Sequence, residues 1–373
     1  MPDDENKSII PVVIAMDDIL NKKHALTRLT DAEFEVLLPK LAAELESNGV
    51  LRETYTDAEI QKDWTLLQKK DATINPMNIS ATEVAGMKVL RKHMRHFHAV
   101  RNYKGHSVES LWTQPCLEKA LRFNRAQHST PYVSEIIRSL SFANGLGKVT
   151  MYRPLMAKKV VAYLADKDNL KEVRVLDACA GWGGRMIGAM SVEGGEGGLK
   201  VHYTGIDPCA KTYEALRAIR DELGLTNVTL INKPAEVALQ ELDPSSKYDI
   251  ALTSPPYYNL ELYSDEPTQS VATKDAGYQV WLNTFLKPVI QGVIRLGVKY
   301  SCWSVKNFKT DKKYDLLDDV IKIHGEHGWH LLDDTVFTMA NSRRPGQKAT
   351  PSEDAAAAPK KTEECTYAFV RVM

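Results

Sequence analysis

The chain has 373 residues, of which 43% are hydrophobic, enough for one large domain and an additional smaller one. Lysine plus arginine and aspartate plus glutamate are equal at 48 each, so only local basic patches, and not the overall charge, can attract a polyanion. Five cysteines without a C-x-x-C pair argue against a disulfide framework or a zinc knuckle and favour a reducing compartment.

The N-terminal stretch MPDDENKSIIPVVIAMDDIL carries acids where a signal peptide would carry positive charge. No apolar run reaches the roughly 18 residues that a membrane span requires. We therefore expect a soluble cytoplasmic protein, of a bacterial cell or a phage-infected host, without a membrane partner.

Residues 25 to 145 are mostly polar and helical in pattern. In TDAEFEVLLPKLAAELESNG, Thr30 or Asp31 can cap a helix that Gly49 terminates. Segments typical of strands are scarce there. We expect residues 1–148 to form a mainly helical N-terminal region and residues 149–373 to form a second, larger domain.

A basic run, LRKHMRHFHAVRNYKGH, occupies residues 90–106 and interleaves cations with Phe97 and Tyr103. Such a run suits contacts with nucleic-acid phosphates. A solvated basic face that packs on the neighbouring domain explains it equally well. Since no acid or cysteine shares the spacing of His93, His96 and His98, we expect no metal site. The candidate nucleic-acid contacts in the run are Arg91, Lys92, Arg95, Arg101 and Lys104.

From about residue 150, short apolar strands alternate with helical stretches, which is typical of an open, largely parallel α/β sheet. No helical stretch separates the last two strands, so we expect an antiparallel hairpin there. Residues 341–364, rich in Ala, Pro and charge, are expected to form a mobile loop between them. The expected strands are 173–178, 202–207, 228–233, 248–254, 299–307, 329–339 and 365–373.

A glycine-rich turn, VLDACAGWGG, follows the first of these strands. Asp177 ends the strand, and Gly181 and Gly183 let the backbone approach a ligand at the sheet edge where open α/β sheets bind ligands. Asp207 ends the next strand, where a carboxylate can accept both hydroxyls of a ribose. The pair indicates a nucleoside-containing cofactor without a pyrophosphate. Alternatively, the glycines only permit close packing of strand and helix.

The fourth strand runs into TSPPYY. Methylation of a base amine requires its nitrogen to move towards tetrahedral geometry, and acceptors aimed at its two hydrogens favour this. The Ser254 hydroxyl and the Pro255 carbonyl can be such acceptors, and Pro255 and Pro256 make the turn rigid. Tyr257 offers a flat face for a base taken out of its stack. A proline-rich strand exit without chemical meaning is the alternative.

In this order, the glycine turn, the acid and S-P-P-Y resemble class I S-adenosylmethionine-dependent methyltransferases, and within them the DNA amino-methyltransferases of the N4-cytosine and N6-adenine type. The resemblance is to phage-type DNA modification methylases over roughly residues 105 to 310. It implies a Rossmann-like, seven-stranded mixed sheet with a terminal antiparallel hairpin, S-adenosylmethionine as cofactor and double-stranded DNA as partner. The serine version of the motif is associated more with cytosine N4 than with adenine N6.

The resemblance also implies site residues. The expected catalytic residues are Ser254, Pro255, Pro256 and Tyr257. A lid is expected over 258–270, where Tyr258 and Asn259 could touch the target base. YRPLMAKKVV corresponds to a helix that closes over the methionine end of the cofactor, and Glu236 substitutes for an acid that usually contacts adenine. The expected cofactor residues are Asp177, Ala178, Gly181, Trp182, Gly183, Asp207, Tyr152, Arg153 and Glu236.

The expected function is site-specific methylation of DNA at an exocyclic amine. Cytosine-C5 methylation needs a cysteine after the fourth strand, and neither Pro115-Cys116 nor Pro208-Cys209 lies there. An RNA or protein-amide methyltransferase, or a DNA-binding module that keeps the fold without activity, remain the alternatives.

Overall fold

The computed structural model describes residues 19, 22–80, 82–147, 149–194, 198–270, 276–340, 361 and 363–371. By their contacts, residues 1–53 and 106–148 form one compact unit, and residues 54–105 and 149–373 form another. Residues 341–360 and 362 of the predicted mobile loop lie outside the described residues. No helix in the described ranges has the length and apolar character needed to cross a membrane.

The smaller unit is helical. Thr30 caps its first helix in a capping box with Glu33, and Gly49 follows the last turn with φ +74°, as the sequence predicts. Its apolar core includes Leu38, Leu121 and Leu140, and the Trp112 indole donates a hydrogen bond to the Leu45 carbonyl at 2.8 Å. The helices are α1 (Asp31–Asn48), α4 (Gln114–Ala126) and α5 (Val133–Ala143).

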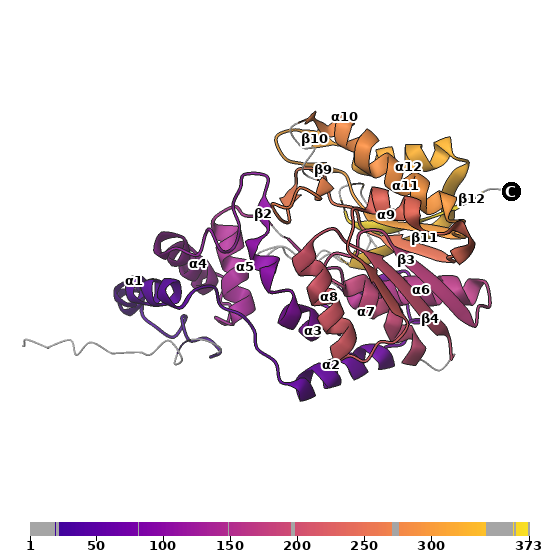
Figure 1. The fold of residues 1–373 in the computed structure, drawn as a ribbon. Helices are drawn as coiled ribbons and strands as arrows, with labels where there is room; N and C mark the ends of the chain where they lie inside the picture. Colours follow the sequence, from indigo (N-terminus) through magenta and orange to yellow (C-terminus); the bar gives the residue numbers. More distant parts are fainter. Residues whose placement is uncertain are drawn as a thin grey trace, which may run out of the picture. The chain divides into compact units, whose positions relative to one another are not determined.

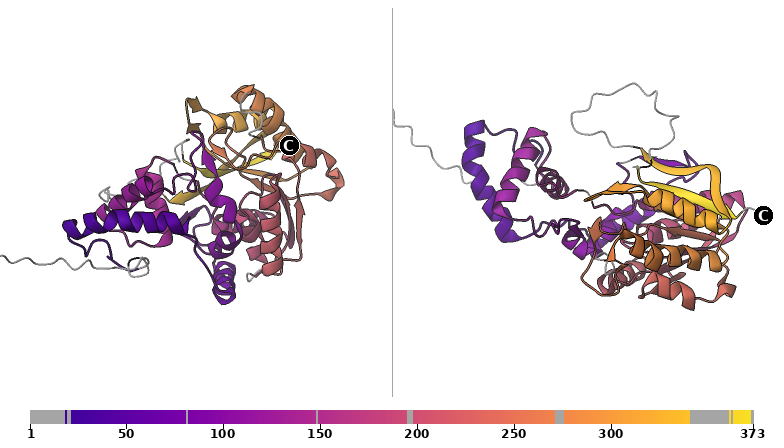
Figure 2. Two further views of the ribbon diagram at one scale, coloured as in Figure 1. Left: turned by 60° about the vertical axis from the view of Figure 1, so that its left-hand side comes forward. Right: turned by 90° about the horizontal axis from the view of Figure 1, so that it is seen from above.

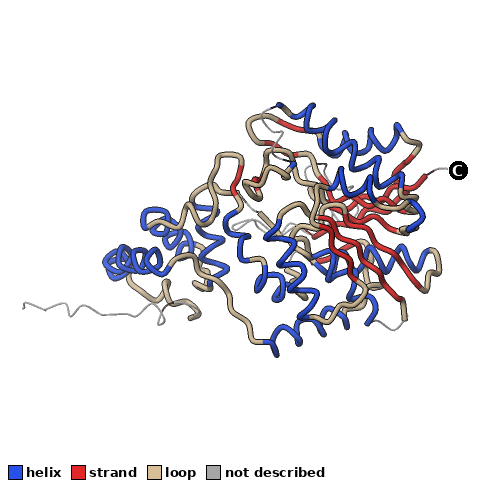
Figure 3. Tube along the Cα trace, in the orientation of Figure 1, coloured by secondary structure: helices blue, strands red, loops and turns tan. Residues whose placement is uncertain are grey.

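The larger unit is built on one eight-stranded sheet with the strand order β1-β11-β12-β8-β6-β3-β4-β5. Neighbours from β8 to β5 are parallel, whereas β12 pairs antiparallel with both β8 and β11. The predicted mixed sheet with its terminal hairpin is therefore confirmed, and Figure 3 shows the strands gathered in one layer. The strands are β1 (Asn78–Ser80), β3 (Glu172–Asp177), β4 (Lys200–Ile206), β5 (Val228–Ile231), β6 (Ile250–Thr253), β8 (Tyr300–Val305), β11 (Trp329–Ala340) and β12 (Cys365–Arg371).

Helices cover both faces of this sheet (Figure 1). Alternating strand residues separate two apolar cores: Val173 and Val175 of β3 face one, and Leu176 faces the other. The first face carries α2 (Asp57–Lys69), α3 (Met87–His93), α6 (Pro154–Lys167), α7 (Gly184–Met190) and α8 (Ala210–Glu222). The second carries α9 (Ala235–Glu241), α10 (Tyr278–Trp281), a π-helical turn (Leu282–Leu286), α11 (Lys287–Arg295) and α12 (Leu316–Glu326).

Short elements complete the unit. The views of Figure 2 show the β11 and β12 ribbons running side by side at one end of the sheet. Two small ladders join loops: β2 (Arg101–Asn102) pairs with β7 (Glu261–Leu262), and β9 (Phe308–Lys309) pairs with β10 (Lys313–Tyr314). The 3-10 turns are Arg95–Ala99, Ser191–Gly194 and Pro244–Ser246.

The division of the chain differs from the prediction, because residues 54–105 belong to the sheet unit and not to a helical N-terminal region of 1–148. Ile60, Trp64 and Leu67 of α2 enter the core of the first sheet face. The Lys158 ammonium, buried on α6, donates to the Leu67 carbonyl at 2.9 Å, and Lys159 donates to three carbonyls between residues 74 and 78. The helix α2, polar on most of its surface, is thus fixed to the sheet unit by one apolar stripe and by Lys158, while Lys159 holds the segment that leads into β1.

Candidate active site

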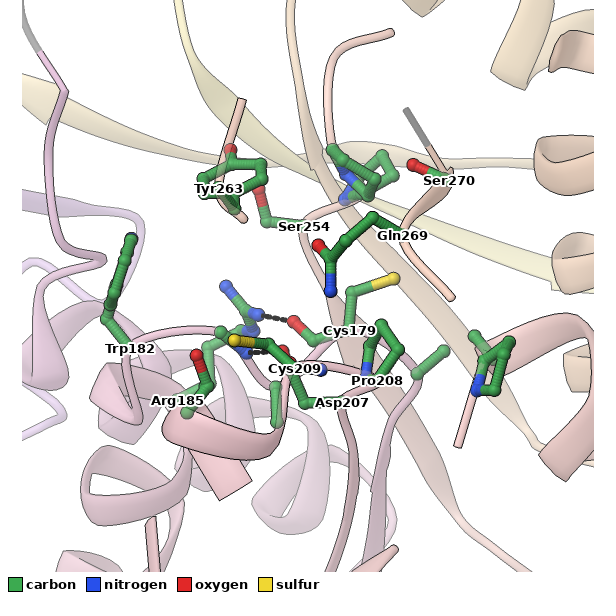
Figure 4. A pocket seen from close by; sticks show the side chains of 18 of the residues that line it. Cys179, Trp182, Arg185, Asp207, Pro208, Cys209, Ser254, Tyr263, Gln269 and Ser270 are labelled. Atoms are coloured by element: carbon green, nitrogen blue, oxygen red, sulfur yellow. Dashed lines mark hydrogen bonds between the residues drawn. The ribbon is translucent and has the colours of Figure 1, made fainter. Parts of the chain in front are cut away.

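A cavity opens at the carboxyl ends of β3, β4 and β6, the edge at which open α/β sheets bind ligands. Its volume is about 950 Å³ including the part open to solvent. Figure 4 shows side chains that line it and labels ten of them. Those named below are Ala178, Cys179, Gly181, Trp182, Gly184, Asp207, Pro208, Cys209, Glu236, Ser254, Pro255, Pro256, Tyr263, Gln269, Ser270, Tyr152, Thr212, Phe285 and Glu364.

Two walls of this cavity differ in origin. The turn wall consists of residues 178–182, 184, 207–209 and 234–236, which follow β3, β4 and β5. The lid wall consists of residues 254–256, which follow β6, and the loop 261–270. In Figure 4, Asp207, Pro208 and Cys209 lie on one side of the cavity, and Ser254, Tyr263, Gln269 and Ser270 lie on the other.

The glycine turn serves both the cavity and the packing of helices. Gly181 lines the cavity with φ +52°. Gly183 has φ +80° and does not line it, since it caps α7 against Leu216. A Cβ on Gly184 would lie 2.1 Å from the Tyr152 carbonyl oxygen. Gly183 is therefore a packing residue and not the predicted cofactor contact.

Asp177 also lies outside the cavity lining. Its side chain is fully buried, pairs with the Arg185 guanidinium at 2.7 Å and accepts a hydrogen bond from the Tyr203 hydroxyl at 2.7 Å. Its other oxygen accepts from the Cys179 backbone at 3.3 Å. Asp177 was predicted to bind the cofactor, but these partners occupy it beneath the turn, where it positions the loop that follows β3.

Asp207 lies in the cavity lining at the end of β4. One carboxylate oxygen accepts from the Gly181 backbone at 2.9 Å and the other from the Cys209 backbone at 3.0 Å. A carboxylate has about four lone-pair directions, so each oxygen can accept a further hydrogen bond from a ligand. Burial raises the pKa of Asp207 to about 6, against the effect of these backbone hydrogen bonds.

Glu236 lines the cavity from the first turn of α9. Its Oε2 atom is buried and has no hydrogen-bond partner among the described residues, and burial raises the pKa of the carboxyl. A buried acceptor without a partner costs roughly 1–3 kcal/mol, and a ligand donor at this point would relieve that cost. The position of Glu236 matches the expectation of a ligand-facing acid.

The segment before α6 contributes one of its two predicted residues. Tyr152 lines the cavity, where its ring lies 5.2 Å from the Arg185 guanidinium and its hydroxyl contacts the Thr366 hydroxyl at 3.0 Å. Burial raises the pKa of Tyr152 to about 12. Arg153 is the N-cap residue of α6 and is not among the lining residues, so it is not placed to hold a ligand in this cavity.

Three of the four residues of S-P-P-Y line the cavity: Ser254, Pro255 and Pro256. Tyr257 does not. Its ring is 7% exposed and stacks on Phe308, with centroids 5.7 Å apart. The predicted role of its face as a platform for a base therefore does not fit this structure, in which the ring supports the turn from behind.

Tyr258 and Asn259 were predicted to touch nucleic acid, but both are engaged inside the protein. Tyr258 has φ +45° and is 5% exposed, within ring distance of Tyr278, Trp281 and Tyr314. Asn259 accepts a hydrogen bond from the Thr310 hydroxyl at 3.1 Å. An aromatic residue with positive φ is uncommon, and here the surrounding rings hold it.

The loop 261–270 covers the cavity, at the place where a lid was expected. Tyr263 lines the cavity and donates to the Glu261 carboxylate at 2.6 Å. Burial, with a smaller contribution from Glu364, raises the pKa of Glu261 to about 7, against the hydrogen bond from Tyr263 and the charge of Lys306. A carboxyl that titrates near neutrality beside a cavity is typical of functional sites.

Several lining residues were not predicted. Pro208 and Cys209 directly follow Asp207, so their place at the same sheet edge could have been found. Phe285 reaches the cavity from the π-helical turn, a rare element that is frequent at functional sites. Glu364, directly before β12, also lines the cavity. It lies more than 100 residues after Ser254 in the chain, so no local sequence pattern predicts its place in the cavity.

The basic run packs on the sheet unit, and none of its predicted cations lines the cavity. Lys92 pairs with Glu222 at 2.7 Å and Asp57 at 3.1 Å, Arg101 pairs with Asp265, and Lys104 lies over the Tyr103 ring. The Arg91 guanidinium contacts the Tyr55 hydroxyl at 3.4 Å, and Arg95 begins a 3-10 turn. In the described part of the chain, no cluster of three or more His, Cys, Asp or Glu side chains is arranged to hold a metal ion.

The same run packs against two residues that line the cavity. His96 contacts the Thr212 hydroxyl at 2.9 Å, and the rings of His96 and Phe97 lie 5.2 and 5.0 Å from that of Trp182. Thr212 and Trp182 both line the cavity. Lys92, His96, Phe97 and Arg101 therefore pack within the larger unit, as the second interpretation of the basic run expects.

Comparisons with known proteins found distant structural likenesses. A putative class I S-adenosylmethionine-dependent methyltransferase from Listeria monocytogenes is 14% identical, with 85% of this chain and 89% of that chain covered and a TM-score of 0.40. The magnesium protoporphyrin IX methyltransferase of Synechocystis, with bound S-adenosylmethionine, is 14% identical over 68% and 84% at 0.35. An rRNA methylase from Streptococcus thermophilus is 12% identical over 60% and 100% at 0.33.

No protein-family model and no curated protein sequence matches the chain. Because the structural matches have TM-scores below 0.5, we draw nothing about ligand or substrate from them. The strand order β5-β4-β3-β6-β8-β12-β11, with its antiparallel hairpin, is that of the Rossmann-like methyltransferase fold.

Proposed function

We propose that this protein is an S-adenosylmethionine-dependent DNA methyltransferase that acts on the exocyclic amine of a base taken out of its stack, cytosine N4 first and adenine N6 next. The observation that carries the proposal is the position of Ser254, Pro255 and Pro256, which face the same cavity as Gly181 and Asp207. A cofactor site and acceptors for an amine are thereby brought to one edge of the sheet.

The turn wall fits the cofactor. Asp207 has free lone pairs for the two ribose hydroxyls, and Gly181 presents its backbone without a side chain. The unpartnered Oε2 of Glu236 suits a donor such as the amine of adenine. Ala178, Trp182 and Tyr152 supply further lining on this side. When bound, S-adenosylmethionine would supply a methyl group on a positively charged sulfur.

The lid wall fits an amine. The nitrogen of a base amine is a weak nucleophile because its lone pair is conjugated with the ring. Acceptors that hold its two hydrogens favour the tetrahedral geometry needed for attack, and the Ser254 hydroxyl and the Pro255 carbonyl are available for this. Because φ of Pro255 and Pro256 is fixed by their rings, these oxygens need little further ordering.

The test is transfer of labelled methyl from S-adenosylmethionine to unmodified duplex DNA and, separately, to RNA, followed by nucleoside mass spectrometry. Ser254→Ala should lower kcat by roughly 100- to 1,000-fold, in line with the loss of one catalytic hydrogen-bonding group. Ser245→Ala, at an exposed position in a 3-10 turn, is the matched control and should leave the rate unchanged.

The outcomes separate the candidates. Methylated cytosine or adenine in DNA, lost in Ser254→Ala, supports the proposal and identifies the base. Label in RNA alone would assign the protein to RNA methylation. Cofactor binding without transfer to either nucleic acid would favour a binding module that keeps the fold.

A further inference from the structure

The lid loop 261–270 is held in place by contacts from two parts of the larger unit, β2 and the start of α8. Its first residues form β7, which pairs with β2. Arg101 pairs with the Asp265 carboxylate. The Glu266 carboxylate accepts hydrogen bonds from the Ala210 backbone, at 3.2 and 3.3 Å, where α8 begins. A loop tied at these points presents its side chains to the cavity at low cost in conformational entropy.

Gln269 is the residue of this loop that the proposed mechanism leaves unused. Its side chain is 8% exposed and lines the cavity. The amide nitrogen Nε2 is buried and has no hydrogen-bond partner in the described part of the chain. A buried donor without an acceptor destabilises the folded protein, because it has lost its hydrogen bond to water. A ligand acceptor in the cavity would remove this cost.

The side of the cavity indicates which ligand this is. Figure 4 shows the Gln269 amide entering the cavity from the side of Ser254 and Ser270, facing Asp207 and Pro208. The turn wall already offers Asp207 and the unpartnered Glu236 carboxylate, both of which are acceptors. Gln269 offers a donor from the lid wall, the wall that also carries the serine that would hold the amine.

The two bases that carry a suitable amine share one further feature. In cytosine the ring nitrogen N3 lies next to the N4 amine, and in adenine N1 lies next to the N6 amine, and both ring nitrogens are acceptors. Thymine and uracil carry an N–H donor and a carbonyl at the corresponding places. A donor on the same wall as Ser254 therefore suits an amino base, which offers an amine and an acceptor at two neighbouring atoms.

We propose that Gln269 is a specificity-determining residue whose Nε2 donates a hydrogen bond to the ring nitrogen adjacent to the target amine. This inference rests on the proposed function. The hydrogen bond fixes the rotation of the base in its plane, so that the amine hydrogens meet Ser254 and Pro255 and the nitrogen lone pair faces the methyl donor. No bond is made or broken at Gln269.

The test is a double-mutant cycle between the protein and the base. Wild type and Gln269→Leu are compared on two duplexes, one with the normal target base and one with its 3-deaza (cytosine) or 1-deaza (adenine) analogue, in which C–H replaces the ring nitrogen. The analogue's altered reactivity is common to both proteins and cancels in the cycle. Gln279→Leu, at an exposed position of α10, is the matched control.

With the normal base, Gln269→Leu should lower kcat/KM about tenfold or more, as expected when a buried hydrogen bond is lost. With the analogue, kcat/KM should fall for wild type and for Gln279→Leu, because the acceptor of the Gln269 hydrogen bond is missing. For Gln269→Leu, kcat/KM should fall only by the factor that the altered reactivity of the analogue causes. Affinity for S-adenosylmethionine, measured by calorimetry, should be unchanged. Gln269→Glu, which keeps the size of the side chain but has no donor when ionised, should behave as Gln269→Leu does.

If the enzyme is active, two results would overturn the role of Gln269 and leave the proposed function intact. In the first, the fold-losses in kcat/KM from Gln269→Leu and from the deaza base multiply, so the two changes act independently. In the second, Gln269→Leu binds S-adenosylmethionine more weakly than wild type does. The second result would assign the amide to the cofactor. Failure of the wild type to methylate any DNA would overturn the proposed function and this inference together.

Discussion

The turn wall and the lid wall of the cavity are built in different ways. The turn wall follows three neighbouring parallel strands, and its conformation depends on residues close in sequence, such as Gly181 and Asp207, which hydrogen-bond to each other. The lid wall depends on residues far apart in the sequence. Arg101 and Ala210 hold the loop 261–270, and Glu364, directly before β12, lines the same cavity. A short motif can encode the first wall, whereas the second exists only after the chain has folded.

The largest effect, on the stability of the protein, is expected from a substitution where the turn wall packs most closely. A Cβ at Gly184 would lie 2.1 Å from the Tyr152 carbonyl oxygen, and backbone must move to admit it. We expect Gly184→Ala to lower the free energy of unfolding by about 3 kcal/mol, as severe overpacking does. That corresponds to a fall in Tm of roughly 6 to 12 °C, measurable by thermal denaturation.

The matched control is Gly325→Ala. Gly325 lies in α12, where a Cβ would meet no atom within 4 Å, so alanine should leave Tm unchanged or raise it slightly through its better helix propensity. Equal falls in both variants would mean that the packing of α6 on α7 does not constrain the turn.

A smaller effect is expected from Asp207, which the proposed function assigns to the cofactor. Asp207→Asn should weaken S-adenosylmethionine binding by about 30-fold, the equivalent of roughly 2 kcal/mol for hydrogen bonds to a charged group. Since the pKa of Asp207 is raised to about 6, wild-type affinity should fall as the pH drops below 6, while that of Asp207→Asn should stay flat. Calorimetric titrations at pH 5 and 7.5 measure both.

The same group should act on stability with the opposite sign. A raised pKa means that the ligand-free folded protein binds this proton more tightly than the unfolded chain does, so stability is lost as the pH rises from about 4 to 6. Asp207→Asn should therefore keep or raise Tm at pH 8 while it loses affinity. If Asp207→Asn lowers both the Tm at pH 8 and the affinity for S-adenosylmethionine, Asp207 is needed for the stability of the fold and its role in binding is not shown. Asp221→Asn, at an exposed position, is the control.

The smallest effect is expected from the lid wall's exposed ion pair, Arg101 with Asp265. Exposed pairs contribute roughly 0–1 kcal/mol, so Arg101→Ala and Asp265→Ala should each lower kcat/KM by about 2- to 5-fold through a looser lid. If Arg101 instead contacts a DNA phosphate, Arg101→Ala should reduce the slope of log Kd against log salt by about 1, and Asp265→Ala should strengthen DNA binding. Lys104→Ala, on the same run, is the comparison.

Much of the fold was predictable because its signals are local. Alternating strands and helices after residue 150 indicated the parallel sheet, and the absence of a helix between the last two strands indicated the hairpin that β11 and β12 form. The capping box at Thr30 and the glycine at 49 marked both ends of α1. The eighth strand, β1, was not predicted, because three residues in a polar region carry no periodic signal.

The place of a residue could be predicted better than its orientation. The motif put both Ser254 and Tyr257 at the end of β6, but the ring of Tyr257 turns to Phe308 and that of Tyr258 to the cluster around Trp281. Asp177 likewise ends the correct strand, yet Arg185 and Tyr203 take its oxygens. Spacing fixes where a side chain begins, and neighbouring groups decide where it points.

By itself, the sequence determined the α/β class, the edge of the sheet at which the cavity opens, and the residues Gly181, Asp207 and Ser254 at that edge. These follow from patterns that depend on a few consecutive residues. Only the tertiary structure decided that residues 54–105 complete the sheet unit and that their basic run packs against Trp182 of the cavity lining. It also decided that Gln269 presents to the cavity a donor without a partner among the described residues. Those outcomes depend on which surfaces meet when apolar area is buried, and contacts between distant segments leave no trace in the local order of residues.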